Sequence, residues 1–109
     1  ISPPTIDRKE QKRLEAQERQ RLSTLKKPLE KRITQLEKEM EQLNKTLSSI
    51  DAQMGDASLY DAANKDKLKF MLNQQMECKK RLSVIEEEWM EKQEALEDVL
   101  TNRHINTTN

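Results

Sequence analysis

Few side chains in this chain of 109 residues could take part in bond-making chemistry. The lone cysteine, Cys78, lies at an apolar helical position, which favours burial over reactivity. The lone histidine, His104, lies in a polar tail, and the acidic run of Glu86, Glu87 and Glu88 is typical of a solvated helical face. A single cysteine forms no intramolecular disulfide and suggests no metal cluster. The sequence therefore predicts no catalytic site, no metal and no cofactor, hence no enzyme.

The chemistry that the sequence does offer is the recognition of phosphate by cations. Residues 1–32 hold ten basic and five acidic residues, a net charge of +5, and the remainder of the chain carries −5. A weaker second patch is a run of three consecutive cations, Lys79, Lys80 and Arg81. The main candidate nucleic-acid-binding residues are Arg8, Lys9, Lys12, Arg13, Arg19, Arg21, Lys26, Lys27, Lys31 and Arg32.

Several of these cations share a helical face. Arg8 and Lys12 are four residues apart, so on a helix they form a ridge that can follow a phosphate backbone, with an affinity that falls as salt rises. The alternative is a solvated helix with local ion pairs such as Glu15 with Arg19. Because little in the sequence could read bases, we expect phosphate contacts with little sequence preference. Trp89 is expected to pack in the core, with base stacking a minor alternative.

The composition favours long helices over a compact globule. Charged residues make up 37% of the chain, hydrophobic ones 33%, and only three residues are aromatic. This is too little apolar mass for a globular core, and it is typical of a coiled coil. No stretch approaches the roughly 18 apolar residues of a membrane span, and no signal peptide is visible. We therefore expect a cytoplasmic location and no membrane contact.

Proline and the helical pattern divide the chain. The pair Pro3 and Pro4 excludes helix at the start, Asp7 is a candidate N-cap, and Pro28 predicts a kink or break. We expect three regions: the end of a linker over 1–6, one coiled-coil domain over 7–100 and a disordered tail over 101–109. Within the domain we expect a helix over about 7–26, a kink at 27–28, a helix over about 29–54, a turn over 55–63 and a helix over about 64–100.

Two apolar seams with alternating steps of three and four residues lie on the second and third of these helices. Such spacing is the heptad pattern of coiled coils. The seam of 64–100 is interrupted by Gln75 and Lys92. The first seam comprises Leu29, Ile33, Leu36, Met40, Leu43, Leu47, Ile50 and Met54. The second comprises Leu68, Met71, Gln75, Cys78, Leu82, Ile85, Trp89, Lys92, Leu96 and Val99.

The two seams match when they are paired antiparallel. Each facing pair of residue numbers then sums to 118, which places the reversal near residue 59, beside the lone glycine, Gly55. We expect Gly55 to end the first seam helix in a left-handed conformation, with Leu59 and Tyr60 folded over the seam. Candidate caps are Asp56, Asp61 and Asn64. Representative facing pairs are Ile50 with Leu68, Ile33 with Ile85, and Leu29 with Trp89.

The predicted fold class is thus all-α: a two-helix antiparallel coiled-coil hairpin with a basic N-terminal helical extension. A parallel dimer of straight chains is the structural alternative. The hairpin is favoured because a short loop holds the two seams at high effective concentration, so the fragment is expected to be monomeric.

Three stretches, taken in order, resemble a known family. They are "RKEQKRLEAQERQRLSTLKKPLEKRITQLEKEMEQLNKTL", "SLYDAANKDKLKFML" and "EEEWMEKQEALE". A basic helix, a leucine-patterned coil, a Leu-Tyr turn and a closing Trp resemble the C-terminal coiled-coil domain of ABC-F ATP-binding cassette proteins, in particular Uup-like and YheS-like members. The resemblance covers about residues 8–100. Departures are Ala63-Asn64, where many members have Asp-Pro, and Pro28.

The resemblance implies a non-catalytic domain of a soluble ATPase. In that family the hairpin is associated with DNA in Uup-like members and with the ribosome in relatives, which implies a role with DNA or ribosomal RNA. ATP and magnesium would be bound by the parent's other domains, because this chain has no GxxxxGK[ST] motif. Since residue 1 is isoleucine, we expect the chain to be a piece of a longer protein.

Two other functions fit the same residues. One is a structural or protein-interaction arm that positions the parent's ATPase domains or a partner, without nucleic acid. The other is a stand-alone coiled-coil adaptor. Because the segment 7–26 has few apolar anchors, we also predict that it is mobile in isolation.

Overall fold

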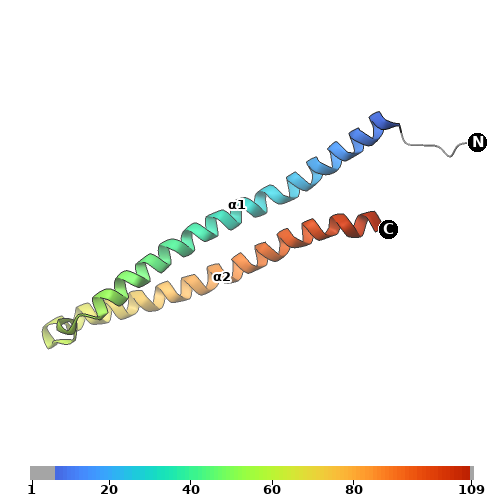
Figure 1. Cartoon of the computed structure of the whole chain (residues 1–109). Helices are drawn as coiled ribbons and strands as arrows, with labels where there is room; N and C mark the ends of the chain where they lie inside the picture. The colour runs from blue at the N-terminus through green and yellow to red at the C-terminus, as the bar shows by residue number, and fades with distance from the viewer. Residues whose placement is uncertain (1–6, 109) are drawn as a thin grey trace, which may run out of the picture.

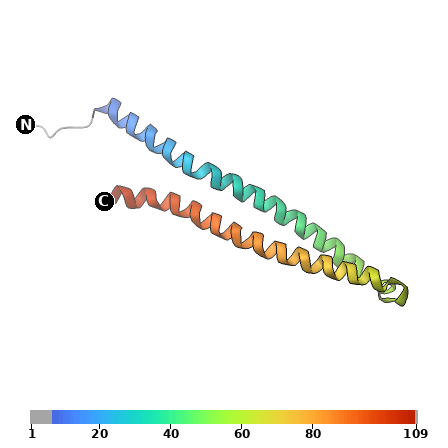
Figure 2. The same ribbon diagram turned by 180° about the vertical axis from the view of Figure 1, so that it is seen from behind.

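A computed structural model describes residues 7–108, with side chains over 7–101. Two long helices, α1 (Arg8–Met54) and α2 (Lys65–Thr108), are joined by two short 3₁₀ turns, η1 (Ala57–Tyr60) and η2 (Ala62–Asn64). Both views show the helices side by side and antiparallel, with the turn at one end and the start of α1 and the end of α2 at the other (Figures 1 and 2). The predicted all-α hairpin is confirmed, and the end-to-end rod of straight chains is excluded for this structure.

Helix α1 begins at Asp7 and continues through Pro28. The Asp7 carboxylate accepts a hydrogen bond from the Lys9 amide at 3.5 Å, so the predicted N-cap is confirmed. The expected division into two helices at 27–28 is wrong, because α1 is a single helix of 47 residues. A proline in the interior of a helix destabilises that helix by about 3 kcal/mol. Here the proline is exposed, and Leu22 and Ile33, on either side of it, are both buried, which holds the helix together across the missing hydrogen bond.

The core is the contact line between α1 and α2. Leu36 and Ile85 are the most deeply buried, at 0% and 1% exposure. Burying one such side chain contributes about 1.5–3 kcal/mol, and these residues therefore supply much of the pairing energy. Near the turn, Ile50, Met71 and Leu59 form a buried cluster against which Met54 and Leu68 pack. The buried hydrophobic residues are Leu22, Ile33, Leu36, Ile50, Leu59, Met71 and Ile85.

The reversal lies where the sequence places it, but Gly55 does not have the expected conformation. Its φ and ψ are −76° and −12°, so the prediction of a left-handed glycine is wrong. The Gly55 amide donates to the carbonyls of Asp51 and Ala52, at 3.1 and 3.3 Å, which continues the helical geometry for one more residue. The chain then leaves the helix at Asp56, whose backbone is extended.

Side-chain hydrogen bonds stabilise this turn. The Asp56 carboxylate accepts from the amide and the hydroxyl of Ser58, both at 3.0 Å, and these bonds lower the pKa of Asp56. The Tyr60 hydroxyl donates to the Met54 carbonyl at 2.9 Å, and Asn64 Nδ2 donates to the Ser58 carbonyl at 2.7 Å. Leu59 is buried as predicted, whereas the Tyr60 ring is 59% exposed and contributes mainly through its hydroxyl.

Helix α2 is longer than the sequence pattern indicated. It starts at Lys65, one residue after the predicted 64, and runs to Thr108 instead of ending near 100, so the expected disordered tail is helical up to that residue. Neither glycine nor proline follows Gly55, and adding residues to an existing helix is cheap compared with starting one. The linker expected over 1–6 lies outside the described residues.

Because α2 is longer than expected, part of the predicted basic extension packs against it. Leu22 on α1 is 7% exposed, and Leu100 on α2 lines the same surface hollow, so α2 reaches the level of Leu22. Thus only the first turns of α1 lack buried residues, and the rest of the predicted extension is part of the hairpin.

Candidate nucleic-acid interface

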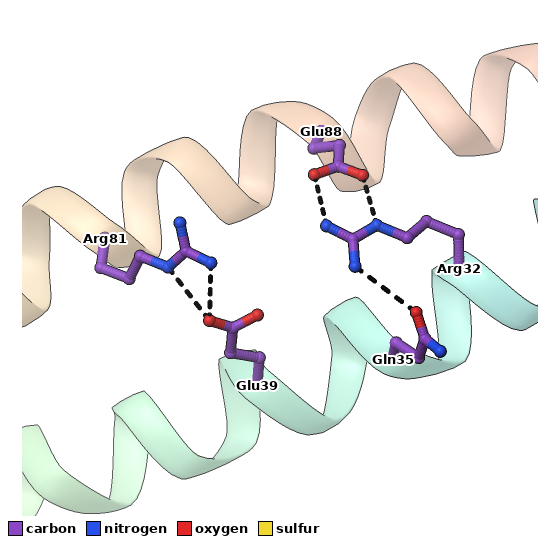
Figure 3. Close-up of polar contacts among 5 residues, drawn as sticks. All are labelled: Arg32, Gln35, Glu39, Arg81 and Glu88. Carbon is purple, nitrogen blue, oxygen red and sulfur yellow. Dashed lines mark hydrogen bonds and ion pairs between the residues drawn. The ribbon is translucent and has the colours of Figure 1, made fainter.

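The cationic segment, residues 8–32 of α1, is not uniformly free to bind a polyanion, because Arg32 is paired across the hairpin. Its Nε donates to Glu88 Oε2 at 2.5 Å and its Nη2 to Glu88 Oε1 at 2.7 Å (Figure 3). Its Nη1 donates more weakly to Gln35 at 3.4 Å. The hydrogen bond raises the pKa of Arg32 and lowers that of Glu88. We therefore remove Arg32 from the candidate interface.

Arg81 of the weaker patch is also paired across the hairpin. Its Nε and Nη2 both donate to Glu39 Oε1, at 3.0 and 2.9 Å (Figure 3). Lys79 and Lys80 are exposed and form no ion pair in the described part of the chain, but Arg81 serves the hairpin itself. The patch is therefore reduced to two adjacent lysines, which point to different sides of a helix.

Three further cations of α1 pair with acids on the same helix. Arg21 donates to both oxygens of Glu18, at 3.1 and 2.8 Å, and this hydrogen bonding raises the pKa of Arg21. Arg13 lies 3.3 Å from Glu10. A looser pair joins Lys26 Nζ to a Glu30 carboxylate oxygen at 3.9 Å. Exposed pairs of this kind are worth little, so phosphate can compete for these cations.

Six predicted interface residues remain exposed and without an ion pair among the described residues. Five of them lie in two groups on α1, one in the first turns and one around Lys27, and Arg19 lies between the groups. Eighteen residues make five helical turns, about 27 Å, so Lys27 lies on the same side as Lys9, and Lys31 on the same side as Arg13. The six are Arg8, Lys9, Lys12, Arg19, Lys27 and Lys31.

A shallow hollow lies between these two groups. It has a volume of about 410 Å³ and is bordered mainly by cationic and polar side chains of α1, with one apolar residue of α2. Its cations, Arg19, Lys26 and Lys27, face one acid, Glu30. This local excess of positive charge would favour an anionic ligand. The other lining residues are Leu22, Ser23 and Leu100.

Cys78 and Trp89, which were considered for chemistry other than phosphate binding, lie at seam positions of the coiled coil. Cys78 is a free, half-buried thiol, as its seam position indicated. Trp89 is half-buried and shares a hollow with Glu37 and Met40, whereas Leu29 was its expected partner. Helical side chains lean toward the N-terminus of their helix, which directs the Trp89 side chain toward the turn and therefore toward Glu37 and Met40. Trp89 is also unusual in that its Nε1 is buried without a hydrogen-bond partner.

The described residues include no group of three or more His, Cys, Asp or Glu placed to hold a metal ion. Their helices also include none that is apolar over a length sufficient to span a bilayer.

Sequence reasoning missed the acids that pair with the predicted cations. Glu88 was interpreted as part of a solvated acidic run and Glu39 was not considered, although each directly precedes a seam residue, Trp89 or Met40. In a coiled coil such flanking positions face the partner helix and are where interhelical ion pairs form. That spacing was the signal that could have identified them.

Comparison with known proteins gives one partial match. Over 45 residues, 41% of this chain, the sequence is 51% identical to the Probable ATP-binding protein YheS of Haemophilus influenzae. The match covers 7% of that protein's length. No family model matches the chain, and no solved structure is similar enough to match. The match supports a relationship to an ATP-binding protein, in agreement with the resemblance noted from the residues.

Proposed function

We propose that this chain is the non-catalytic coiled-coil hairpin of an ABC-F-type ATP-binding protein and that it binds nucleic acid through phosphate contacts. The partial match to an ATP-binding protein supports the first half of the proposal. The observation that carries the second half is the set of six exposed, unpaired cations on α1, defined above. A cytoplasmic location goes with this proposal.

The contacts should be electrostatic and nearly independent of sequence. Arg8, Lys9 and Lys12 form one group of cations, and Lys27 with Lys31 forms another about 27 Å away on the same uninterrupted helix. Because each phosphate contact releases counterions, the affinity should fall steeply with salt. Aromatic side chains are absent from this part of α1, so bases have nothing on which to stack there.

The test is charge reversal on α1. A variant with Lys9, Lys12, Arg13, Lys27 and Lys31 changed to Glu should lose binding to a 20-base-pair DNA duplex and to a ribosomal RNA fragment by at least about tenfold at low salt. The slope of log affinity against log salt should also become shallower on DNA, by about 0.9 for each phosphate that the variant no longer neutralises.

A matched control changes the same number of charges elsewhere. The five exposed lysines of the control lie outside the cationic segment: Lys38, Lys45, Lys65, Lys67 and Lys69, all changed to Glu. If the two variants weaken binding equally, the interface is not on the segment 8–32. If the unmodified chain binds neither polymer, the proposed nucleic-acid binding is wrong. The favoured function is then a structural arm that positions the ATPase domains or a partner protein.

A further inference from the structure

The two edges of the hairpin are not equivalent. One edge, which we call the closed edge, carries both interhelical ion pairs, Arg32 with Glu88 and Glu39 with Arg81. These four residues directly precede seam residues. Residues that directly follow seam residues lie along the opposite edge, which we call the open edge. No interhelical ion pair bridges the open edge in the described part of the molecule. Near the turn, Gln75 Nε2 of α2 donates a hydrogen bond to Asp51 Oδ1 of α1 across this edge at 3.0 Å.

Charge explains part of this difference. On the open edge Glu30 follows Leu29 and Glu86 follows Ile85, so two acids occupy flanking positions at about the same level of the hairpin. Like charges at such positions repel and do not close the edge. Nearer the turn on this edge, Lys79 of α2 occupies the position that faces Glu37 of α1. The two residues nevertheless form no ion pair.

A large hollow lies on this open edge. Its volume is about 580 Å³, and Met40 and Trp89 give it an apolar part. Glu37 and Glu41 border it, and Glu41 has a long exposed pair with Lys45 at 3.4 Å. Along α1 the hollow extends from Glu37 to Ser48, which is about 16 Å or three helical turns. Asn44 is its remaining lining residue.

Trp89, which borders this hollow, also has a buried polar atom. Its indole Nε1 is buried and has no acceptor in the described structure. A buried donor without a partner costs about 1–3 kcal/mol, so the packing of this indole in the hairpin is not optimal. Trp residues with a polar atom at an apolar surface are also frequent anchors at protein interfaces.

The geometry points to a docking site on the open edge for an amphipathic helix of a partner protein with apolar residues flanked by Lys or Arg. An apolar side chain would pack on Met40 and Trp89, and the cations would face Glu37 and Glu41. The length of the hollow fits about three turns of helix. The charged side chains that line the hollow are two carboxylates and one lysine, Lys45, and this net negative charge disfavours nucleic acid here. This surface is independent of the cations in the proposed function.

Trp89 is the single tryptophan of the chain and borders the hollow, so tryptophan emission follows the surroundings of this one residue. The probes are two synthetic 18-residue helical peptides with the same leucine stripe, one flanked by Lys and the other by Glu. We expect the Lys-flanked peptide to shift Trp89 emission to shorter wavelength with saturation, and the Glu-flanked peptide to have at least about tenfold lower affinity. Equal binding of the two peptides, or no shift with the Lys-flanked one, would overturn the proposal.

Two variants locate the site. The double change Glu37→Lys and Glu41→Lys should weaken the Lys-flanked peptide at least about tenfold. The control Glu94→Lys and Asp98→Lys has the same spacing and charge change on exposed residues of α2, and it should alter affinity less than about twofold. Thermal melting of both variants shows whether the hairpin is intact. If the control variant loses as much affinity for the Lys-flanked peptide as the Glu37→Lys, Glu41→Lys variant, the peptide does not bind at the open edge.

A further measurement with the DNA duplex distinguishes this inference from the proposed function. The 20-base-pair DNA duplex should bind the Glu37→Lys, Glu41→Lys variant no more weakly than the unmodified chain, whereas the Lys-flanked peptide loses affinity, because the six cations of the proposed function lie at Lys31 or earlier in α1. If the duplex shifts Trp89 emission and competes with the peptide, the open edge is a nucleic-acid surface and the peptide site is refuted.

Discussion

Arg32 and Glu88, separated by 56 residues in sequence, are joined by two short hydrogen bonds across the hairpin. One heptad closer to the turn, Glu39 and Arg81 form the second interhelical pair, with the charges exchanged between the helices. A slip of one heptad would place Arg32 opposite Arg81 in one direction and Glu39 opposite Glu88 in the other. The two pairs therefore favour a single register, which an apolar seam with regular spacing leaves less well defined.

Charge exchange tests this register control. Arg32→Glu should lower the melting temperature, because it places two carboxylates together, and so should Glu88→Arg. The double variant should recover most of the loss because the pair is restored with opposite polarity. Lys31→Glu, at an exposed residue without an ion pair, serves as the control and should change the melting temperature little. A double variant no more stable than the singles would contradict the role of the pair.

Acid should weaken the hairpin through the same contacts. Hydrogen bonds from Arg32 and Ser58 lower the pKa values of Glu88 and Asp56, so folding favours their charged forms. This stabilisation is complete above the ordinary carboxyl pKa of about 4 and is lost as pH falls through the lowered values. Urea unfolding from pH 7 to 2 should show a decline that is shallower in Glu88→Gln. An unchanged pH profile in that variant would argue against the assignment.

Core truncation should separate buried from exposed apolar residues. Leu36→Ala should lower the free energy of unfolding by about 2–5 kcal/mol, because Leu36 is fully buried. Leu72→Ala, at a side chain with 45% exposure, should cost less than about 1 kcal/mol. Chemical denaturation of both variants measures the difference. Equal costs would mean that Leu36 is not in the contact line.

The negative φ of Gly55 makes an unusual prediction for a turn glycine. Alanine adopts this conformation without strain, so Gly55→Ala should change the free energy of unfolding by no more than about 1 kcal/mol in either direction. The added Cβ would lie 3.3 Å from the Ala52 carbonyl, which calls for only a small adjustment. A larger loss in denaturant unfolding would instead indicate the left-handed conformation that the sequence had favoured.

Amide exchange should be uneven along α1. Residues 8–19 contain no buried side chain, whereas 33–50 includes Ile33, Leu36 and Ile50. Local opening should therefore be easier in the first segment, and its amides should exchange faster. Slower exchange in 8–19 than in 33–50, measured by mass spectrometry, would show that this end of α1 is held by contacts other than those described.

Local patterns predicted much of the fold. The steps of three and four residues from Leu29 to Met54 require a seam, and the matching second seam requires an antiparallel partner, so the hairpin and its turn follow from the sequence. Pro28 was misleading because its local cost is about 3 kcal/mol, while the burial of Leu22 and Ile33 is a long-range effect that no local rule includes.

The candidate interface was less predictable. Sequence alone identified the cations, since their number and spacing are local properties, but it did not identify which of them are neutralised. Arg32 looked equivalent to Lys31 in the sequence, yet it faces Glu88 whereas Lys31 faces solvent.

The amino-acid sequence by itself thus determined the helical class of the fold, the two apolar stripes and the site of reversal, because these follow from the local periodicity of each stripe and from the match between the two stripes. Only the tertiary structure decided which acids neutralise which bases, which edge of the hairpin stays open and that the Trp89 indole lacks an acceptor. These properties depend on how side chains from two distant segments meet, and a periodic pattern specifies that the stripes meet without specifying what lies beside them.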